Sequence, residues 1–99
     1  MTEFQQLCYQ TLSAKVPAGK VITYGGLAKL INHPKAYRAV GSAMNKNPYA
    51  PEVPCHRVVK ANGDLGEFAY EISLKIERLQ AEGVFVENGK IVNFQQICV

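Results

Sequence analysis

The spacing of the hydrophobic positions changes several times along the chain, and each change marks the limit of a predicted element. Residues 3–15 carry apolar side chains at the three- and four-residue intervals of an amphipathic helix, with Thr2 as its N-cap. The helical pattern returns at residues 25–31, at 34–46, where Pro34 suits the first turn, and at 70–82. The pattern therefore predicts four helices.

The segments between these helices have the character of short strands. Residues 20–24 and 57–60 are rich in β-prone side chains, and Asn62-Gly63 predicts a turn that folds the second of them back as a hairpin. Asn88-Gly89 predicts another hairpin within residues 84–92. The resulting fold class is mainly α with short β hairpins, and it contains a helix-turn-helix formed by the second and third helices.

The predicted helix 34–46 has two different faces. Tyr37, Val40 and Met44 are expected to face the core. The other face is small and polar with two cations: Lys35, Arg38, Gly41, Ser42 and Asn45. Such a face can enter the minor groove of DNA, which is only about 6 Å wide. Arg38 would then project into the base stack, the alternative being an exposed arginine without a partner.

The composition is that of one soluble domain. The chain has 99 residues, 47% apolar and 19% charged, and no apolar run approaches the about 20 residues of a membrane span. Three cysteines at wide spacing argue against a disulfide framework, and the N-terminus lacks a signal-peptide pattern. We expect a cytoplasmic protein, or a nuclear one if the source is a eukaryote.

The charge is unevenly distributed. Residues 15–60 hold eight Lys and Arg against Glu52 alone, whereas the remainder holds three against seven acidic residues. A polyanion is the natural partner of such a basic segment, because neutralised phosphates supply most non-specific affinity for nucleic acid. A basic solvated surface without a partner is the alternative.

The candidate for chemistry is Pro54–Val58, with the sequence Pro-Cys-His-Arg-Val. A thiol attacks carbon only as its thiolate, and an imidazole and a guanidinium nearby favour that form. The alternative is a small buried cysteine in a turn, which is what we expect of Cys8. A metal site of Cys55, His56 and His33 is disfavoured because the ligand spacing is wrong, and no cofactor is implied.

Two further residues break local rules. Glu82 places a carboxylate in the last turn of a helix, where the helix dipole disfavours it. Asn47 is a polar residue at a helix end directly before proline. Such misfits are where function is expected to override propensity, although for either residue taken alone a solvated surface position is the more common explanation.

Four stretches occur in order and together resemble the C-terminal domain of the O6-alkylguanine-DNA alkyltransferases: residues 19–24, 36–44, Asn47-Pro48 and Pro54–Val58. The resemblance covers roughly residues 4–83. It implies a winged helix-turn-helix-like domain that binds double-stranded DNA containing O6-alkylguanine. It also implies a monomer that does not associate with a membrane. It further implies irreversible transfer of the alkyl group to Cys55 after the guanine has been flipped out.

The resemblance also implies roles for single residues. Cys55 is the nucleophile, His56 relays its proton through a water, Glu82 orients the imidazole, and Asn47 stabilises the active-site turn. Tyr24 presses on the phosphate of the lesion and Arg38 fills the space that the base leaves. The other DNA-contacting residues are Lys35, Gly41, Ser42 and Asn45. The pocket for the alkylguanine is lined by Met44, Pro54, Val58, Phe68 and Ala69.

The sequence departs from the family at three places. We expect residues 1–99 to be a single domain, without the separate N-terminal domain of typical members. The pocket loop, usually Gly-Tyr-Ser-Gly-Gly, reads Glu-Phe-Ala-Tyr-Glu at residues 67–71 and so loses a tyrosine hydroxyl and two small residues. Tyr37 stands where the family usually has a small residue.

Two alternatives to alkyl transfer remain. Alkyltransferase-like proteins bind alkylguanine without chemistry and recruit other repair machinery, but they usually lack the cysteine that this chain has at position 55. A winged-helix regulator that kept only the fold would have no reason to retain Cys55, His56, Asn47 and Glu82. The retained set favours transfer.

Overall fold

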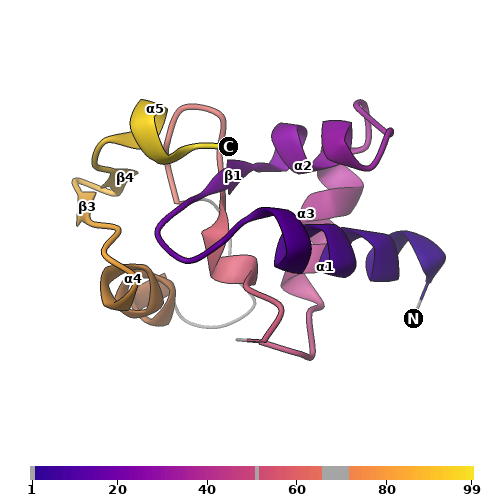
Figure 1. Cartoon of the computed structure of the whole chain (residues 1–99), viewed down its shortest axis with the longest axis horizontal. Coiled ribbons are helices and arrows are strands. Elements are labelled where there is room, and N and C mark those ends of the chain that lie inside the picture. The colour runs from indigo at the N-terminus through magenta and orange to yellow at the C-terminus, as the bar shows by residue number, and fades with distance from the viewer. Residues whose placement is uncertain (1, 51, 66–71) are drawn as a thin grey trace.

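Three helices from the first half of the chain surround one apolar cluster (Figure 1). The computed structural model describes residues 2–50, 52–65 and 72–99. The helices α1, α2 and α3 span Glu3–Lys15, Tyr24–Leu30 and Tyr37–Asn45. α2 and α3 are the two helices of the predicted helix-turn-helix, and α1 packs against both.

The helix α1 begins after Thr2, which is its N-cap as predicted. Its hydroxyl accepts a hydrogen bond from the Gln5 N–H, and the Gln5 side chain accepts one from the Thr2 N–H. This reciprocal capping box satisfies two backbone donors that the helix itself cannot pair. α2 begins in a similar way, with the Thr23 hydroxyl accepting from the Gly26 N–H at 2.9 Å.

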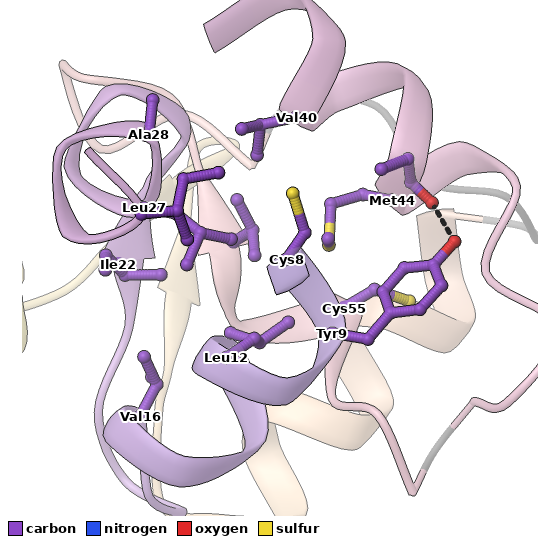
Figure 2. Close-up of a cluster of buried hydrophobic side chains, with 13 residues drawn as sticks. Cys8, Tyr9, Leu12, Val16, Ile22, Leu27, Ala28, Val40, Met44 and Cys55 are labelled. Carbon is purple, nitrogen blue, oxygen red and sulfur yellow. Dashed lines mark hydrogen bonds between the residues drawn. The ribbon is translucent and has the colours of Figure 1, made fainter. Parts of the chain in front are cut away.

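The cluster between these helices is drawn in Figure 2 and includes both Cys8 and Cys55. Cys8 has no exposed surface, which confirms the prediction that it is a core residue. Burial raises the pKa of the Cys8 thiol to about 11, so this thiol stays protonated at neutral pH. Cys8 is therefore a structural residue of the core.

The second half of the chain adds one longer helix and short extended pieces. A 3-10 turn, η1 (Cys55–Arg57), leads into β2 (Val58–Val59), and α4 covers Ile72–Ala81. In Figure 1, α4 and the segments after it lie on the side of the molecule away from α1, α2 and α3. A second, smaller apolar cluster forms there, with Leu79 and Val84 fully or almost fully buried.

The strand β2 pairs with β1 (Ile22–Thr23) in parallel, with Ile22 opposite Val58 and Thr23 opposite Val59. We predicted a hairpin around the Asn62-Gly63 turn. The turn is present, since the Gly63 N–H donates to Lys60 O at 3.0 Å and the Lys60 N–H donates to Asp64 O at 2.8 Å. The rest of the predicted returning segment, beyond Leu65, lies outside the described residues. Val58 and Val59 are both buried, and a strand buried on both sides suits a parallel pair.

The second predicted hairpin is confirmed. β3 (Val86–Glu87) and β4 (Lys90–Ile91) pair antiparallel around Asn88 and Gly89, which both have positive φ, as a tight two-residue turn requires. A short helix that the pattern did not predict, α5 (Phe94–Ile97), follows. The chain then runs beside β1, where Val21 and Cys98 form a parallel bridge.

Several apolar positions predicted to face the core are exposed. The helical spacing of apolar residues places Tyr37, Leu30 and Ile72 on the core-facing sides of their helices, but they are 50%, 48% and 46% exposed, so these three assignments are wrong. α3 also begins later than predicted, because residues 33–36 close a turn with a 2.9 Å bond from the Ala36 N–H to His33 O. Pro34 therefore precedes the helix.

The mainly α fold with small sheets and a helix-turn-helix is otherwise as predicted. Across the described ranges, no helix combines the length and apolar character needed to cross a bilayer.

Replacing Tyr9 by Phe tests the contact between α1 and α3. The Tyr9 hydroxyl is buried and donates to Ala43 O at 2.7 Å, while the Lys46 N–H also donates to that carbonyl at 3.2 Å. Because Ala43 O keeps one partner, we expect Tyr9→Phe to lower the free energy of unfolding by about 1 kcal/mol in urea denaturation. Tyr37→Phe, at a half-exposed site on α3, is the matched control. Equal losses in both variants would contradict the assignment.

Candidate active site

The Cys55 thiol is held in a stiff turn inside the larger apolar cluster. The residue is 1% exposed and begins η1. Its N–H donates to Val53 O at 2.8 Å, and two residues later the Arg57 N–H donates to Pro54 O at 2.9 Å. These bonds fix the backbone on both sides of the thiol, and Pro54 restricts it further because its ring fixes its own φ.

Asn47 ties the end of α3 to the residues just before Cys55. Its side-chain amide donates to Val53 O at 2.9 Å, and its side-chain oxygen accepts from the Tyr49 N–H at 2.9 Å. Asn47 is only 2% exposed. The carbonyl oxygen of Val53 thus accepts hydrogen bonds from both the Asn47 side chain and the Cys55 N–H. The polar residue that looked misplaced before Pro48 is part of the framework of the cysteine turn.

The carboxylate of Glu82 joins His56 and Arg57. Its Oε2 lies 3.0 Å from His56 Nε2, and Arg57 donates from Nε to Oε1 at 2.9 Å and from Nη2 to Oε2. Arg57 also donates from Nη1 to Val16 O at 2.8 Å. The sequence suggested that Arg57 acts on the thiol, but its guanidinium is instead engaged by Glu82 and by the end of α1.

The protonation of this group follows from burial and hydrogen bonding. Burial lowers the pKa of His56, although the hydrogen bond to Glu82 opposes the effect, so the ring is neutral at pH 7. Burial by itself would raise the pKa of Glu82, but the bonds from Arg57 and His56 outweigh it and lower that pKa. With Glu82 ionised, we assign the imidazole proton to Nε2. His56 Nδ1 is then an acceptor, and it is buried with no hydrogen-bond partner among the described residues.

A groove of about 870 Å³ lies over the polar face of α3. It brings together five of the predicted DNA-contacting residues: Tyr24, Arg38, Gly41, Ser42 and Asn45. A Cβ on Gly41 would make an ordinary van der Waals contact with the Tyr24 ring, at 3.9 Å, so Tyr24 lies directly beside this part of α3. Lys35 is exposed but is not among the lining residues. Tyr37, predicted to face the core, lines the groove instead.

Some lining residues were missed by the sequence analysis. Lys60 and Ala61 reach the groove from the turn after β2, and Gly25 and Lys46 lie at the ends of α2 and α3. Lys60 and Lys46 belong to the basic segment, but nothing in the linear pattern shows that the turn after β2 faces α3. That proximity depends on the parallel pairing of β1 and β2.

The predicted pocket residues have different surroundings. Met44 and Val58 pack into the larger apolar cluster, and Pro54 is buried beside Cys55. Phe68 and Ala69 lie outside the described residues. Within the part of the chain that the structure describes, no three His, Cys, Asp or Glu side chains gather as metal ligands, and His33 packs edge-on against Phe4.

Lys75 is a buried charged residue that the sequence analysis missed. It has no exposed surface, and its Nζ donates to Val58 O at 2.8 Å and to Leu65 O. Burial lowers the pKa of Lys75 to about 8, an effect that the charge of Cys55 opposes. A signal was available in the sequence, since Lys75 is one helical turn before Leu79, on the apolar side of α4.

Comparison with known proteins agrees with this arrangement. Residues 3–84 match the family described as 6-O-methylguanine DNA methyltransferase, DNA binding domain. The methylated-DNA–protein-cysteine methyltransferase of Methanosarcina mazei is 49% identical over 81 residues, which are 82% of this chain and 51% of that protein. The chain thus spans about half the length of such relatives.

Solved structures give the same result. A crystal structure of Mycobacterium tuberculosis OGT in complex with DNA has a TM-score of 0.79 and 41% identity, covering 83% of this chain and 50% of that one. S. pombe Atl1, in complex with damaged DNA containing O6-carboxymethylguanine, has a TM-score of 0.84 and 28% identity, covering 100% of this chain and 96% of that one. The match over residues 3–84 shows that the chain belongs to the 6-O-methylguanine DNA methyltransferase family, through its DNA-binding domain.

Proposed function

We propose that this protein repairs DNA by transferring an alkyl group irreversibly from O6 of guanine to the Cys55 sulfur. The observation that carries the proposal is the joined set Cys55, His56 and Glu82: a thiol in a fixed turn, followed by a neutral imidazole that a carboxylate holds through Nε2. A nucleophile, a base and an orienting group are what covalent catalysis requires. The relatives that share this domain are named for the same transfer.

The transfer is balanced without a cofactor. His56 Nδ1 takes the thiol proton, through a bridging water in the arrangement expected for this family. The sulfur then forms a bond to the alkyl carbon while the bond between that carbon and O6 breaks. Guanine leaves with the electron pair of the broken bond and takes up the proton. Glu82 keeps its charge and stabilises the imidazolium that forms in between.

The groove over α3 is the proposed contact with duplex DNA. Gly41 and Ser42 place no large side chain on this side of α3, so the helix backbone can approach the minor groove closely. Arg38 is exposed at the same groove and occupies the space that the alkylated guanine leaves in the base stack when it is flipped out. Tyr24 presses on the phosphate of the flipped nucleotide. The basic segment of residues 15–60 supplies the non-specific attraction to the phosphates.

A second candidate function is recognition of the lesion without transfer. The match to S. pombe Atl1 covers 100% of this chain and 96% of that one, whereas the match to the Methanosarcina mazei methyltransferase covers 82% of this chain and 51% of that protein. The presence of Cys55 beside the His56–Glu82 pair favours transfer over recognition alone. A permanent mark on the protein distinguishes the two functions.

Incubation with an excess of duplex DNA containing O6-methylguanine should raise the intact mass of the protein by one CH₂ unit. Peptide mapping should place the gain on Cys55, and the reaction should stop at one equivalent because the thioether is stable. Cys55→Ser should lose transfer by several orders of magnitude, because an alcohol ionises far less than a thiol, and should retain most of its DNA binding. Mass spectrometry and a binding titration measure the two effects.

Cys98→Ser is the matched control, because Cys98 is a half-buried cysteine outside the candidate site. This variant should transfer as the unaltered protein does. Binding of the lesion without any gain in mass would support recognition over transfer. A methyl group found on Cys8 or Cys98 would refute the assignment of Cys55.

Arg38→Ala should slow transfer from duplex DNA by about tenfold or more, because stabilising an extruded base is worth a few kcal/mol. Transfer from free O6-methylguanine base should change little, since no base has to leave a stack. Lys29→Ala, which removes an exposed cation of α2 outside the groove, is the control. Equal losses of Arg38→Ala on both substrates would count against its role in base extrusion.

The pH dependence of transfer should follow His56. Its pKa lies below the ordinary value of 6.5, mainly because it is buried, so the ring accepts a proton at pH 7 and loses this ability only below pH 6.5. The transfer rate should therefore hold from pH 7.5 to 6.5 and fall at lower pH. Folding stability changes in the same direction, since a lowered pKa stabilises the fold above 6.5 and the stabilisation is lost as the pH falls.

Glu82→Gln tests whether the pH dependence of the transfer rate comes from the His56 ring. It removes the charge that raises the His56 pKa, so the decline in rate should move to lower pH while the maximal rate falls because the ring is less well oriented. Glu77→Gln, at an exposed position of α4, should change neither. Single-turnover rates across pH 5–8, with melting temperatures at each pH, test this. A decline in the rate of Glu82→Gln that begins at higher pH than in the unaltered protein would contradict it.

A further inference from the structure

Tyr37 is a half-exposed aromatic residue for which the proposed reaction, as described, has no use. It is the first residue of α3 and lines the groove of about 870 Å³ next to Arg38. The other large apolar side chains that the described residues expose, such as Leu30 and Phe85, lie outside this groove. An aromatic ring stabilises a fold when it is buried, so an exposed ring contributes little to the free protein. Tyr37 is therefore placed to contact a partner in the groove.

Tyr37 projects from a helix face that otherwise carries small side chains. Tyr37 and Gly41 are four residues apart and therefore share one row along α3. Arg38 and Ser42 form the neighbouring row. The first turn of α3 thus presents two long side chains to the groove, while the next turn lets a partner approach the helix backbone closely.

The charges of the groove indicate the kind of partner. Among the described residues that line it, Arg38, Lys46 and Lys60 are cations and none is acidic. Such cations favour the phosphates of a nucleic acid, and an aromatic ring among them can stack on a base. An apolar protein surface would match the ring but would leave the cations without opposite charges. The groove therefore suits DNA better than an apolar partner.

A duplex that lies close to Gly41 and Ser42 receives the Tyr37 ring in its minor groove. This groove is only about 6 Å wide in B-form DNA, so a ring that stands above the helix backbone reaches the base edges. Large side chains inserted in this way unstack neighbouring base pairs and bend the duplex. The free energy of the deformation depends on the base step, since pyrimidine–purine steps are flexible and A-tracts are stiff with a narrow minor groove.

We propose that Tyr37 is a specificity-determining residue, a second wedge beside Arg38 that makes repair depend on how easily the DNA next to the lesion deforms. The inference rests on the proposed function, because it takes the groove over α3 as the contact with duplex DNA. Arg38 occupies the space that the flipped guanine leaves, and the Tyr37 ring stacks at a base step adjoining that space. No bond to Tyr37 is made or broken. Lesions beside flexible steps are then repaired faster than lesions within stiff DNA.

The first test measures DNA binding and bending without chemistry, in the Cys55→Ser protein. A short duplex carries a central O6-methylguanine, and energy transfer between dyes at its two ends reports the bend. Adding Tyr37→Ala should weaken binding by about tenfold, because base–aromatic stacking is lost, and should reduce the energy transfer in the saturated complex. Tyr37→Phe keeps the ring and should restore both quantities.

Phe85→Ala is the matched control, because it removes a 59% exposed ring that lies outside the groove. It should change neither the affinity nor the bend. Tyr37 is half-exposed, so Tyr37→Ala should fold, and its melting temperature verifies this. If the folded Tyr37→Ala protein binds and bends the duplex as Cys55→Ser alone does, the proposal is wrong.

The second test compares single-turnover transfer on two duplexes that differ only in the DNA beside the lesion. One duplex has TA steps on both sides of the O6-methylguanine, and the other has A-tracts. The unaltered protein should react faster on the flexible duplex, and Tyr37→Ala should reduce the ratio of the two rates several-fold, because less deformation is then required. A purely structural role of Tyr37 would slow both reactions alike. An unchanged ratio would therefore overturn the proposal.

The two tests separate this inference from the proposed function. A protein that gains no mass from alkylated DNA, yet loses affinity and bending in Tyr37→Ala, would refute alkyl transfer and leave the role of Tyr37 established. A protein that transfers the methyl group with the same rate ratio, with and without the Tyr37 ring, would refute the role of Tyr37 alone.

Discussion

The carboxylate of Glu82 is the contact on which the rest of the site depends. It accepts hydrogen bonds from both Arg57 and His56, and Arg57 also reaches the carbonyl of Val16 at the end of α1. One side chain thus fastens the cysteine turn to the end of α4 and, through Arg57, to the N-terminal helix. A carboxylate at a helix C-terminus is unfavourable when it is alone, and here two donors compensate. The same contacts fix the imidazole and the backbone beside the thiol.

The thiol itself belongs to the core, and this sets the conditions for its chemistry. Cys8 and Cys55 are both in the larger apolar cluster, and neither is in contact with much water. An apolar environment favours the neutral thiol, so a buried nucleophile needs charges placed to oppose that effect. The structure offers a neutral imidazole next to Cys55 in the chain, on a turn that packs against α4, whereas burial is the main cause of the raised pKa of Cys8. The two cysteines therefore differ in their neighbours.

Local chemistry predicted much of this structure, and long-range contacts account for most of the errors. The N-cap at Thr2, the end of the helix predicted to finish at residue 82 and the Asn88-Gly89 turn depend on a few adjacent residues and were predicted correctly. Tyr37 was assigned to the core by its spacing, but the groove beside α3 exposes it, and spacing carries no information about a groove. The parallel pairing of β1 with β2 joins distant segments, so no local pattern could predict it. For the site, the motif indicated Cys55, His56 and Glu82, while Lys75 was hidden within an apolar stripe.

The bridge between Val21 and Cys98 has a consequence for how the chain folds. The Val21 N–H donates to Ile97 O and its carbonyl accepts from the Val99 N–H, so β1 has a neighbour from the far end of the chain. Closing so long a loop carries a large entropic cost, while α1, α2 and α3 are linked by short connections. The three-helix unit should therefore assemble early, and residues 97–99 should join late in folding. Because β1 leads directly into α2, the groove-forming helices acquire their final support only when residues 97–99 pair with Val21.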